Sequence, residues 1–175
     1  GGNSLTAPIT LGANQTLYSA ASAATLTLGD VNTGNLHVLT VDGSGNSSIS
    51  GTISGTGSIV KNGVGSLILL GNNTYEGFTT VTQGVIRIQS NNALGSTNLG
   101  TVVGSGGTLE VQNNITVAEP LLLAGFGAPI PATVSSNTMR MGLGALRNVS
   151  GSNTLTNTVV LASNVADNYI NVESG

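Results

Sequence analysis

The hydrophobic and polar positions form short apolar runs separated by Gly and Asn, and this pattern is most regular in residues 55–96. Runs rich in β-branched and aliphatic residues occupy positions 59–60, 67–70, 79–81 and 85–88. Short runs of this kind, cut by residues that tolerate a positive φ, form strands and tight corners rather than helices. The pattern therefore predicts a chain that winds, with one strand per corner.

The same pattern continues on both sides of this segment. Further strands are predicted at residues 25–28, 35–41, 48–50, 51–53, 101–103, 108–111, 115–117, 121–123, 139–141, 145–146, 159–161 and 169–172. The best helix candidate is a short Ser/Ala run at 19–24, which could equally be a corner. Because Pro129 and Pro131 cannot donate to a ladder, residues 125–137 are predicted to form an irregular loop outside the regular coil.

Residues 55–96 also resemble the autotransporter passenger-associated β-strand repeat, found in long surface proteins of Gram-negative bacteria. The resemblance is carried by Gly55-Thr-Gly57, Ile59-Val-Lys61-Asn-Gly63-Val-Gly65, Leu67-Ile-Leu69-Leu-Gly71-Asn-Asn73-Thr-Tyr75-Glu-Gly77, Thr79-Thr-Val81 and Gly84-Val-Ile86. It is specific, because Gly, Lys, Asn and Tyr all fall in register. Residues 107–111, 115–123 and 144–151 resemble segments that follow the core motif in long members, whereas 125–141 match nothing in the family.

Together these observations predict an all-β fold: a right-handed parallel β-helix (β-solenoid) with about 20–25 residues per coil and roughly seven or eight coils. Stacking coils about 4.7–4.9 Å apart lets each short strand pair above and below and bury its inward Val, Ile and Leu. The handedness follows from the family resemblance and from the general rule for parallel crossovers. A β-sandwich is the weaker alternative, because the runs at 67–70 and 121–123 are too continuous for strict alternation.

Residues 1–175 are predicted to be a single solenoid segment of a longer array. Residues 1–14 align without gaps on residues 151–164, with identities at Gly, Asn, Leu, Thr, Leu and Asn. This offset of 150 residues predicts one large unit, with 55–96 as its core repeat motif and 151–164 as the start of the next unit. Since the chain starts at Gly1 without a basic region or an apolar signal core, we expect it to derive from a longer protein.

Composition favours a folded β protein of extracellular type. The chain is 39% hydrophobic and only 6% charged, with a net charge of −3 and no Cys. Disordered chains combine low hydrophobicity with high net charge, so disorder is disfavoured. The absence of Cys excludes disulfides, thiolate nucleophiles and Cys-ligated metals. The lack of a basic patch argues against nucleic-acid binding, and no apolar run reaches the roughly 18–20 residues that span a bilayer, so we expect no membrane insertion of this segment.

No catalytic, metal-binding or cofactor-binding residue is predicted, and no cofactor is expected. His37 is the only histidine and is expected to be structural. Glu110 and Glu119 could approach each other across adjacent coils, as paired carboxylates do in polysaccharide-cleaving enzymes, but surface charges are the better explanation. Lys61 and Arg87 are expected to be solubilising side chains on outward faces.

The resemblance implies a non-enzymatic segment of an extracellular passenger stalk, which extends and presents adhesive or effector regions at the Gram-negative cell surface. The alternative is an adhesin module that binds a host or surface glycan or protein, through the loop at 125–137 or through aromatic side chains. The candidate aromatics are Tyr18, Tyr75, Phe78, Phe126 and Tyr169. The third hypothesis is that the segment is an enzyme of the pectin-lyase-like type.

The predicted partners are neighbouring repeats of the same chain. If both ends of the segment expose apolar coil faces and unpaired strand edges, end-to-end self-association is also expected.

Overall fold

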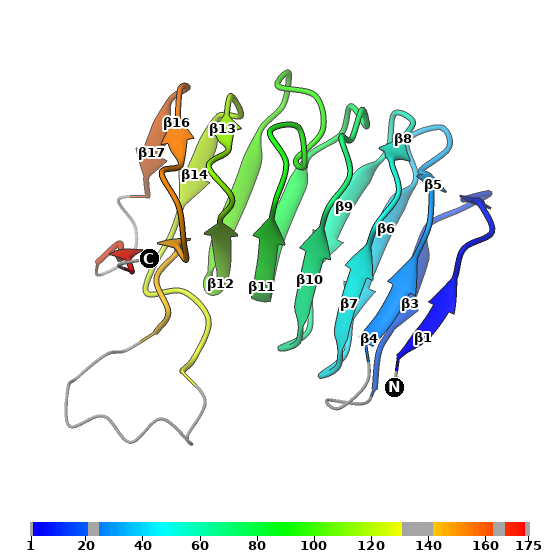
Figure 1. Cartoon of the computed structure of the whole chain (residues 1–175), viewed down its shortest axis with the longest axis horizontal. Coiled ribbons are helices and arrows are strands. Elements are labelled where there is room, and N and C mark those ends of the chain that lie inside the picture. Colours follow the sequence, from blue (N-terminus) through cyan, green and yellow to red (C-terminus); the bar gives the residue numbers. More distant parts are fainter. Residues whose placement is uncertain (1, 21–24, 131–141, 163–166, 174–175) are drawn as a thin grey trace.

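The computed structural model describes residues 2–20, 25–130, 142–162 and 167–173. These residues contain strands and no helix, and parallel strands stack into a β-solenoid of about seven turns (Figure 1). The predicted all-β solenoid is therefore confirmed. The predicted strand at 139–141, residues 131–137 of the predicted loop and residues 21–24 of the Ser/Ala run lie outside the described residues. Within the described part of the chain, no helix is long and apolar enough to cross a membrane.

The strands are short, apart from two that turn a corner. They are β1 (Asn3–Leu5), β2 (Ile9–Thr10), β3 (Gln15–Tyr18), β4 (Thr25–Leu28), β5 (Val31–Asn32), β6 (Val38–Asp42), β7 (Asn46–Ile49), β8 (Ile53–Ser54), β9 (Ser58–Lys61), β10 (Ser66–Leu69), β11 (Thr79–Ile88), β12 (Thr101–Val111), β13 (Thr116–Val117), β14 (Leu121–Leu123), β15 (Leu146–Asn148), β16 (Thr154–Leu155), β17 (Val159–Leu161) and β18 (Ile170–Val172). The predicted strands at 25–28, 121–123 and 159–161 have these bounds. Each of the predicted pairs 79–81/85–88 and 101–103/108–111 belongs to one continuous strand.

Each coil passes three faces in turn, and every strand pair is parallel. The β1 face stacks β1, β4, β7, β10, the second half of β11, the second half of β12, β15 and β18. The β3 face stacks β3, β6, β9, the first halves of β11 and β12, β14 and β17. The β2 face, which lies between them in chain order, holds β2, β5, β8, β13 and β16.

Register gives the length of a coil directly. Leu67 pairs with Ile86 and Ile86 with Leu109, which are steps of 19 and 23 residues. The next step on the same face, from Leu109 to Leu146, is 37 residues. The ordinary steps agree with the predicted coil length within one residue. The long step contains the segment between β14 and β15, whose described parts lie at the lower left of Figure 1. They still bond to the coil before them, since Ala128 N donates to Thr108 Oγ1 at 2.8 Å.

The core is a ladder of inward-facing aliphatic side chains that runs along the solenoid axis. On β10, for example, Leu67 and Leu69 are fully buried whereas Ile68 between them is only half-buried. Alternation of this kind is what a strand with one buried face requires. The resulting cluster is continuous from Leu11 to Leu146.

Lys61 corrects one expectation, because its side chain faces inward and is only 1% exposed. On β9 the alternation places Ile59 inside, Val60 outside and Lys61 inside, in register between Val41 and Val81. Its aliphatic stem fills the core, and its Nζ donates to the Gly63 carbonyl at the corner. Burial lowers the pKa of Lys61 to about 8, an effect that Asp42 partly offsets.

Two residues of the core motif explain why its corners need Asn and Gly. The Asn73 side chain is buried and links three coils, because its Oδ1 accepts from Ile53 N at 2.8 Å and its Nδ2 donates to Ala93 O at 2.6 Å. Gly84 has a φ of 72° at the bend within β11, and a Cβ there would collide with the carbonyls of the coil before it. Asn therefore replaces missing backbone bonds, and Gly allows the close approach of coils.

The segments aligned at an offset of 150 residues lie on different faces. Residues 3–5 form β1 on the β1 face, whereas the aligned residues 153–155 contain β16 on the β2 face. The sequence match therefore does not put equivalent residues on equivalent strands, and the large repeat unit stays a prediction.

Candidate functional site

Four features of the described residues are candidates for function: a buried polar cluster, a charge ladder, an outward apolar groove and an open end of the core. The polar cluster is buried within the wall of the solenoid, and the other three are accessible from outside. Each is built by side chains from successive coils, far apart in sequence.

The buried polar cluster lies where the β2 face meets the β3 face. Tyr75 is completely buried, and its hydroxyl lies 2.5 Å from the Thr79 hydroxyl. Thr79 pairs in register with Thr101 of the next coil, and the carboxyl of Glu119 lies beside the Thr101 hydroxyl. Glu119 is only 4% exposed, which corrects the expectation that it is a surface charge.

Two polar atoms of this cluster lack a hydrogen-bond partner within the described residues, Thr101 Oγ1 and Glu119 Oε1. The two groups are neighbours but do not reach hydrogen-bonding geometry. Burial raises the pKa of Glu119 to about 7, and the adjacent Thr101 hydroxyl partly offsets the rise. Burial likewise raises the pKa of Tyr75 above its usual range, so it stays a neutral phenol.

The charge ladder runs along the outside of the β1 face. Arg87 pairs in register with Glu110, and Glu110 with Arg147. Arg87 Nε donates to Glu110 Oε2 at 2.7 Å, Arg147 Nη1 donates to Glu110 Oε1, and Arg147 Nη2 donates to Glu173 Oε1 at 2.5 Å. The two arginines cover Glu110 and leave it 1% exposed. Burial opposes the charge of Arg147, but its contacts with Glu173 and Glu110 more than compensate and raise its pKa above the ordinary value.

Glu110 and Glu119 therefore have different partners on different parts of the coil. Glu110 is held between two arginines on the β1 face, and Glu119 is held against Thr101 at the opposite end of β12. Arg87, whose side chain is 34% exposed, faces outward as expected, but it acts in an ion pair.

An apolar groove of about 260 Å³ lies on the outside of the β3 face. Thr80, Val102, Leu122 and Val160 follow one another in register along this face. The groove is lined by Phe78, Leu99, Gly100, Thr101, Val102, Pro120, Leu121, Leu122, Thr158 and Val160. Sequence reasoning missed it, because its members come together only through the coil register.

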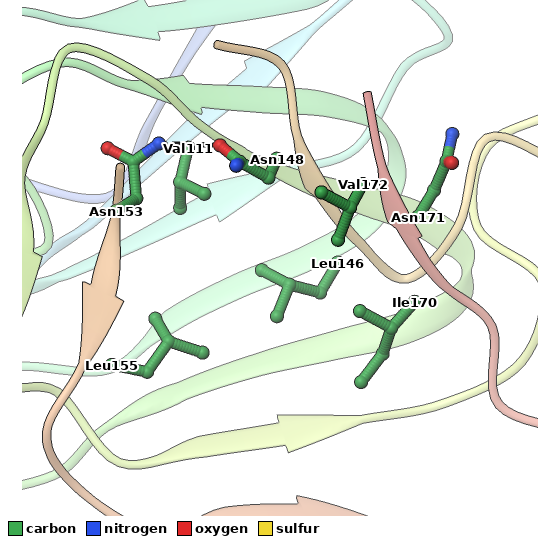
Figure 2. Close-up of a pocket in the computed structure, with 8 residues that line it drawn as sticks. All are labelled: Val111, Leu146, Asn148, Asn153, Leu155, Ile170, Asn171 and Val172. Atoms are coloured by element: carbon green, nitrogen blue, oxygen red, sulfur yellow. Dashed lines mark hydrogen bonds between the residues drawn. The ribbon is translucent and has the colours of Figure 1, made fainter. Parts of the chain in front are cut away.

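The core is open at the coil formed by β15–β18, where a cavity of about 350 Å³ remains. Figure 2 shows the apolar side chains of Val111, Leu146, Leu155 and Ile170 turned toward one another, while Asn171 points away from them. Ile170 and Val172 are 47% and 71% exposed. Within the described residues, this cavity is the interior of a coil that has a neighbouring coil on one side.

The predicted aromatic candidates separate into buried and accessible residues. Tyr75 is completely buried, so it cannot contact a ligand. Tyr18, Phe78 and Tyr169 are 67%, 45% and 38% exposed, and Phe126 is half-buried. Only Phe78 lines the groove.

His37 is half-buried and lies in the turn before β6. Its ring lies near Gly34, and its carbonyl accepts from Ser58 N at 3.1 Å. The acids nearby in sequence, Asp30 and Asp42, accept hydrogen bonds from the backbone N–H groups of Thr52 and Gly43. Across the described ranges, no group of three or more His, Cys, Asp or Glu residues is arranged to hold a metal ion.

Comparison with known proteins gives one family match and two curated relatives. Residues 59–88 match the family model described as "Passenger-associated-transport-repeat". The chain is 45% identical over 73 residues to "Adhesin BmaC autotransporter" of Brucella suis biovar 1 (strain 1330), and 49% identical over 59 residues to "Extracellular serine protease" of Serratia marcescens.

The two matches cover 39% and 33% of this chain, but only 2% and 6% of the relatives. The chain therefore corresponds to a small part of each relative. No solved structure matches the chain significantly.

Proposed function

The chain contains a passenger-associated-transport-repeat at residues 59–88, and from this premise we propose that it is a non-enzymatic segment of an extracellular stalk. The segment extends the passenger from the surface of a Gram-negative cell and presents adhesive or effector regions. The names of the two relatives, an autotransporter adhesin and an extracellular protease, support this location.

The observation that carries the proposal is the stack of in-register coils around one apolar core. Each coil adds one strand spacing, so about seven coils extend the rod by roughly 34 Å. Nearest-neighbour stacking makes such a rod extendable, because each added coil buries the face of the one before it. The two carboxyl groups considered as an acid–base pair, Glu110 and Glu119, lie in the charge ladder and in the polar cluster instead.

Coil deletion tests this role, because a stalk tolerates the loss of one whole coil. Removing residues 47–66 brings Leu67 into the register position of Ser47, so the faces stay aligned. The matched control removes only residues 47–56, which shifts the following strands to the wrong face. In the full-length protein, we expect the first deletion to keep surface display and protease resistance, and the second to lose both.

Surface display is measured with an epitope tag and external protease. Equal loss of display in both deletions would count against the stalk, since it would mean that specific residues of the removed coil are required.

The second candidate is an adhesin module that binds a protein partner, and the apolar groove on the β3 face favours it. A groove lined by Phe78, Leu99 and Leu122 suits an apolar side chain of a protein better than a sugar hydroxyl. Leu122→Ser, at a position that is 39% exposed, should reduce cell adhesion without changing display. Unchanged adhesion in this variant would leave only the stalk role.

A further inference from the structure

The carboxyl of Glu119 is buried at a position where a negative charge is energetically unfavourable. Glu119 is 4% exposed and lies in the turn between β13 and β14. The turn is clamped by the coils on both sides, since Thr101 N donates to Pro120 O at 2.9 Å and Asn157 Nδ2 donates to Ala118 O at 2.9 Å. No charged residue is present in residues 99–103 or 154–160, which pack on either side.

Tyr75 is the titratable neighbour of this carboxyl, since the Glu119 charge adds to the raised pKa of Tyr75, and it is itself buried and neutral. An ionised carboxylate can only accept hydrogen bonds, and it needs several donors to replace water. Here one hydroxyl, that of Thr101, lies beside it. A protonated carboxyl both donates and accepts, so one proton provides a partner for Glu119 Oε1 and Thr101 Oγ1, the two atoms of this cluster that lack one within the described residues.

We propose that Glu119 is a proton-operated latch that closes the coil formed by β12, β13 and β14. With the carboxyl protonated, its O–H donates to Thr101 Oγ1 and the turn stays clamped between its neighbours. When the proton leaves, the described residues offer no cation to this buried charge, and the turn loosens toward water. The latch makes this part of the stalk firmer in acidic than in neutral surroundings.

The direction of the pH effect follows from the folded and unfolded forms of Glu119. The pKa of about 7 in the folded coil lies above the ordinary value of 4.5, so the folded form holds the proton more tightly. The stabilising contribution is complete below pH 4.5, falls as the pH rises, and is lost above about pH 7. Each unit of this pKa difference changes the opening equilibrium about tenfold.

The test compares the chain with Glu119→Gln and with Glu76→Gln, which removes an exposed carboxylate one residue from Tyr75. Amide exchange is measured at Thr101 and Leu121, whose N–H groups bond to Pro120 O and Thr158 O on either side of the latch. After correction for intrinsic rates, we expect opening in the unmodified chain to rise at least about tenfold between pH 5 and pH 8. Glu119→Gln should remove this rise, and Glu76→Gln should keep it.

A rise that persists in Glu119→Gln would overturn the latch. If that variant does not fold, ¹³C NMR of the unmodified chain decides, because it follows the Glu carboxyl carbons directly. A Glu119 resonance that titrates near pH 7 supports the latch, and one that titrates near pH 4.5 overturns it.

Discussion

Coils in the middle of the stack and the coil formed by β15–β18 have the same architecture but differ in burial. Ile86 and Ile170 are the same residue type and lie on the same register line of the β1 face, through Leu109 and Leu146. Ile86 is completely buried, whereas Ile170 is 47% exposed. Burial in a solenoid is therefore set by the number of neighbouring coils, and equal apolar patterns in the sequence do not mean equal contributions to stability.

The largest expected difference is between the stability losses caused by Ile86→Ala and by Ile170→Ala. Removing the buried side chain should cost about 2–5 kcal/mol of unfolding free energy, because it leaves a cavity between two coils. The same change at Ile170 should cost less than about 1 kcal/mol, since half of the side chain is already in water. Guanidinium unfolding followed by circular dichroism measures both. Equal costs would mean that another molecule covers Ile170 in solution.

The second largest effect concerns the buried Asn73 amide, which links three coils in the middle of the stack. Asn73→Ala should cost about 2 kcal/mol, because it leaves Ile53 N–H and Ala93 C=O buried without partners. Asn72→Ala, at the exposed neighbouring position, should stay within about 0.5 kcal/mol. The same unfolding experiment compares them. A small cost at Asn73 would indicate that water enters the corner and replaces the amide.

Much of the fold could be predicted, because strand length, corner residues and the apolar ladder are local properties of the sequence. The inward position of Lys61 was also readable, since strict alternation from Ile59 puts it inside, but its charge suggested an outward face. Glu119 precedes Pro120 in a turn where no alternation applies. Its burial depends on the coils on either side.

The candidate surfaces depend even more on register than the core does. The groove joins Phe78, Leu99 and Val160, and the charge ladder joins Arg87 to Arg147 across the long step. These residues come together only when each coil has a known length. The extra residues between β14 and β15 make one step much longer than the others, so a fixed period would have misplaced every later residue.

A third and smaller effect concerns the contact between β12 and β15, where the middle coils meet the coil formed by β15–β18. Glu110→Gln should cost about 1 kcal/mol, because it removes the charge that holds Arg147 of β15 to the coil before it, across partly exposed arginines. Glu173→Gln, which removes the more exposed partner of Arg147, should cost less than half of this. Amide exchange at Val149, which donates to Val111 O, reports the opening of the contact between β12 and β15. If the two variants raise the exchange rate equally, Glu110 contributes no more to this contact than Glu173 does.

The smallest expected effect is self-association through the coil formed by β15–β18. β18 presents Ile170 and Val172 to solvent at the open cavity, and unpaired strand edges with apolar side chains promote association. Sedimentation velocity at rising protein concentration should therefore show weak self-association. Val172→Lys should reduce it, because a lysine on an edge strand opposes pairing. Val64→Lys provides the matched control, since Val64 is 63% exposed at a corner in the middle of the stack. Association that survives Val172→Lys but not Val64→Lys would move the contact from the open coil to the side of the rod.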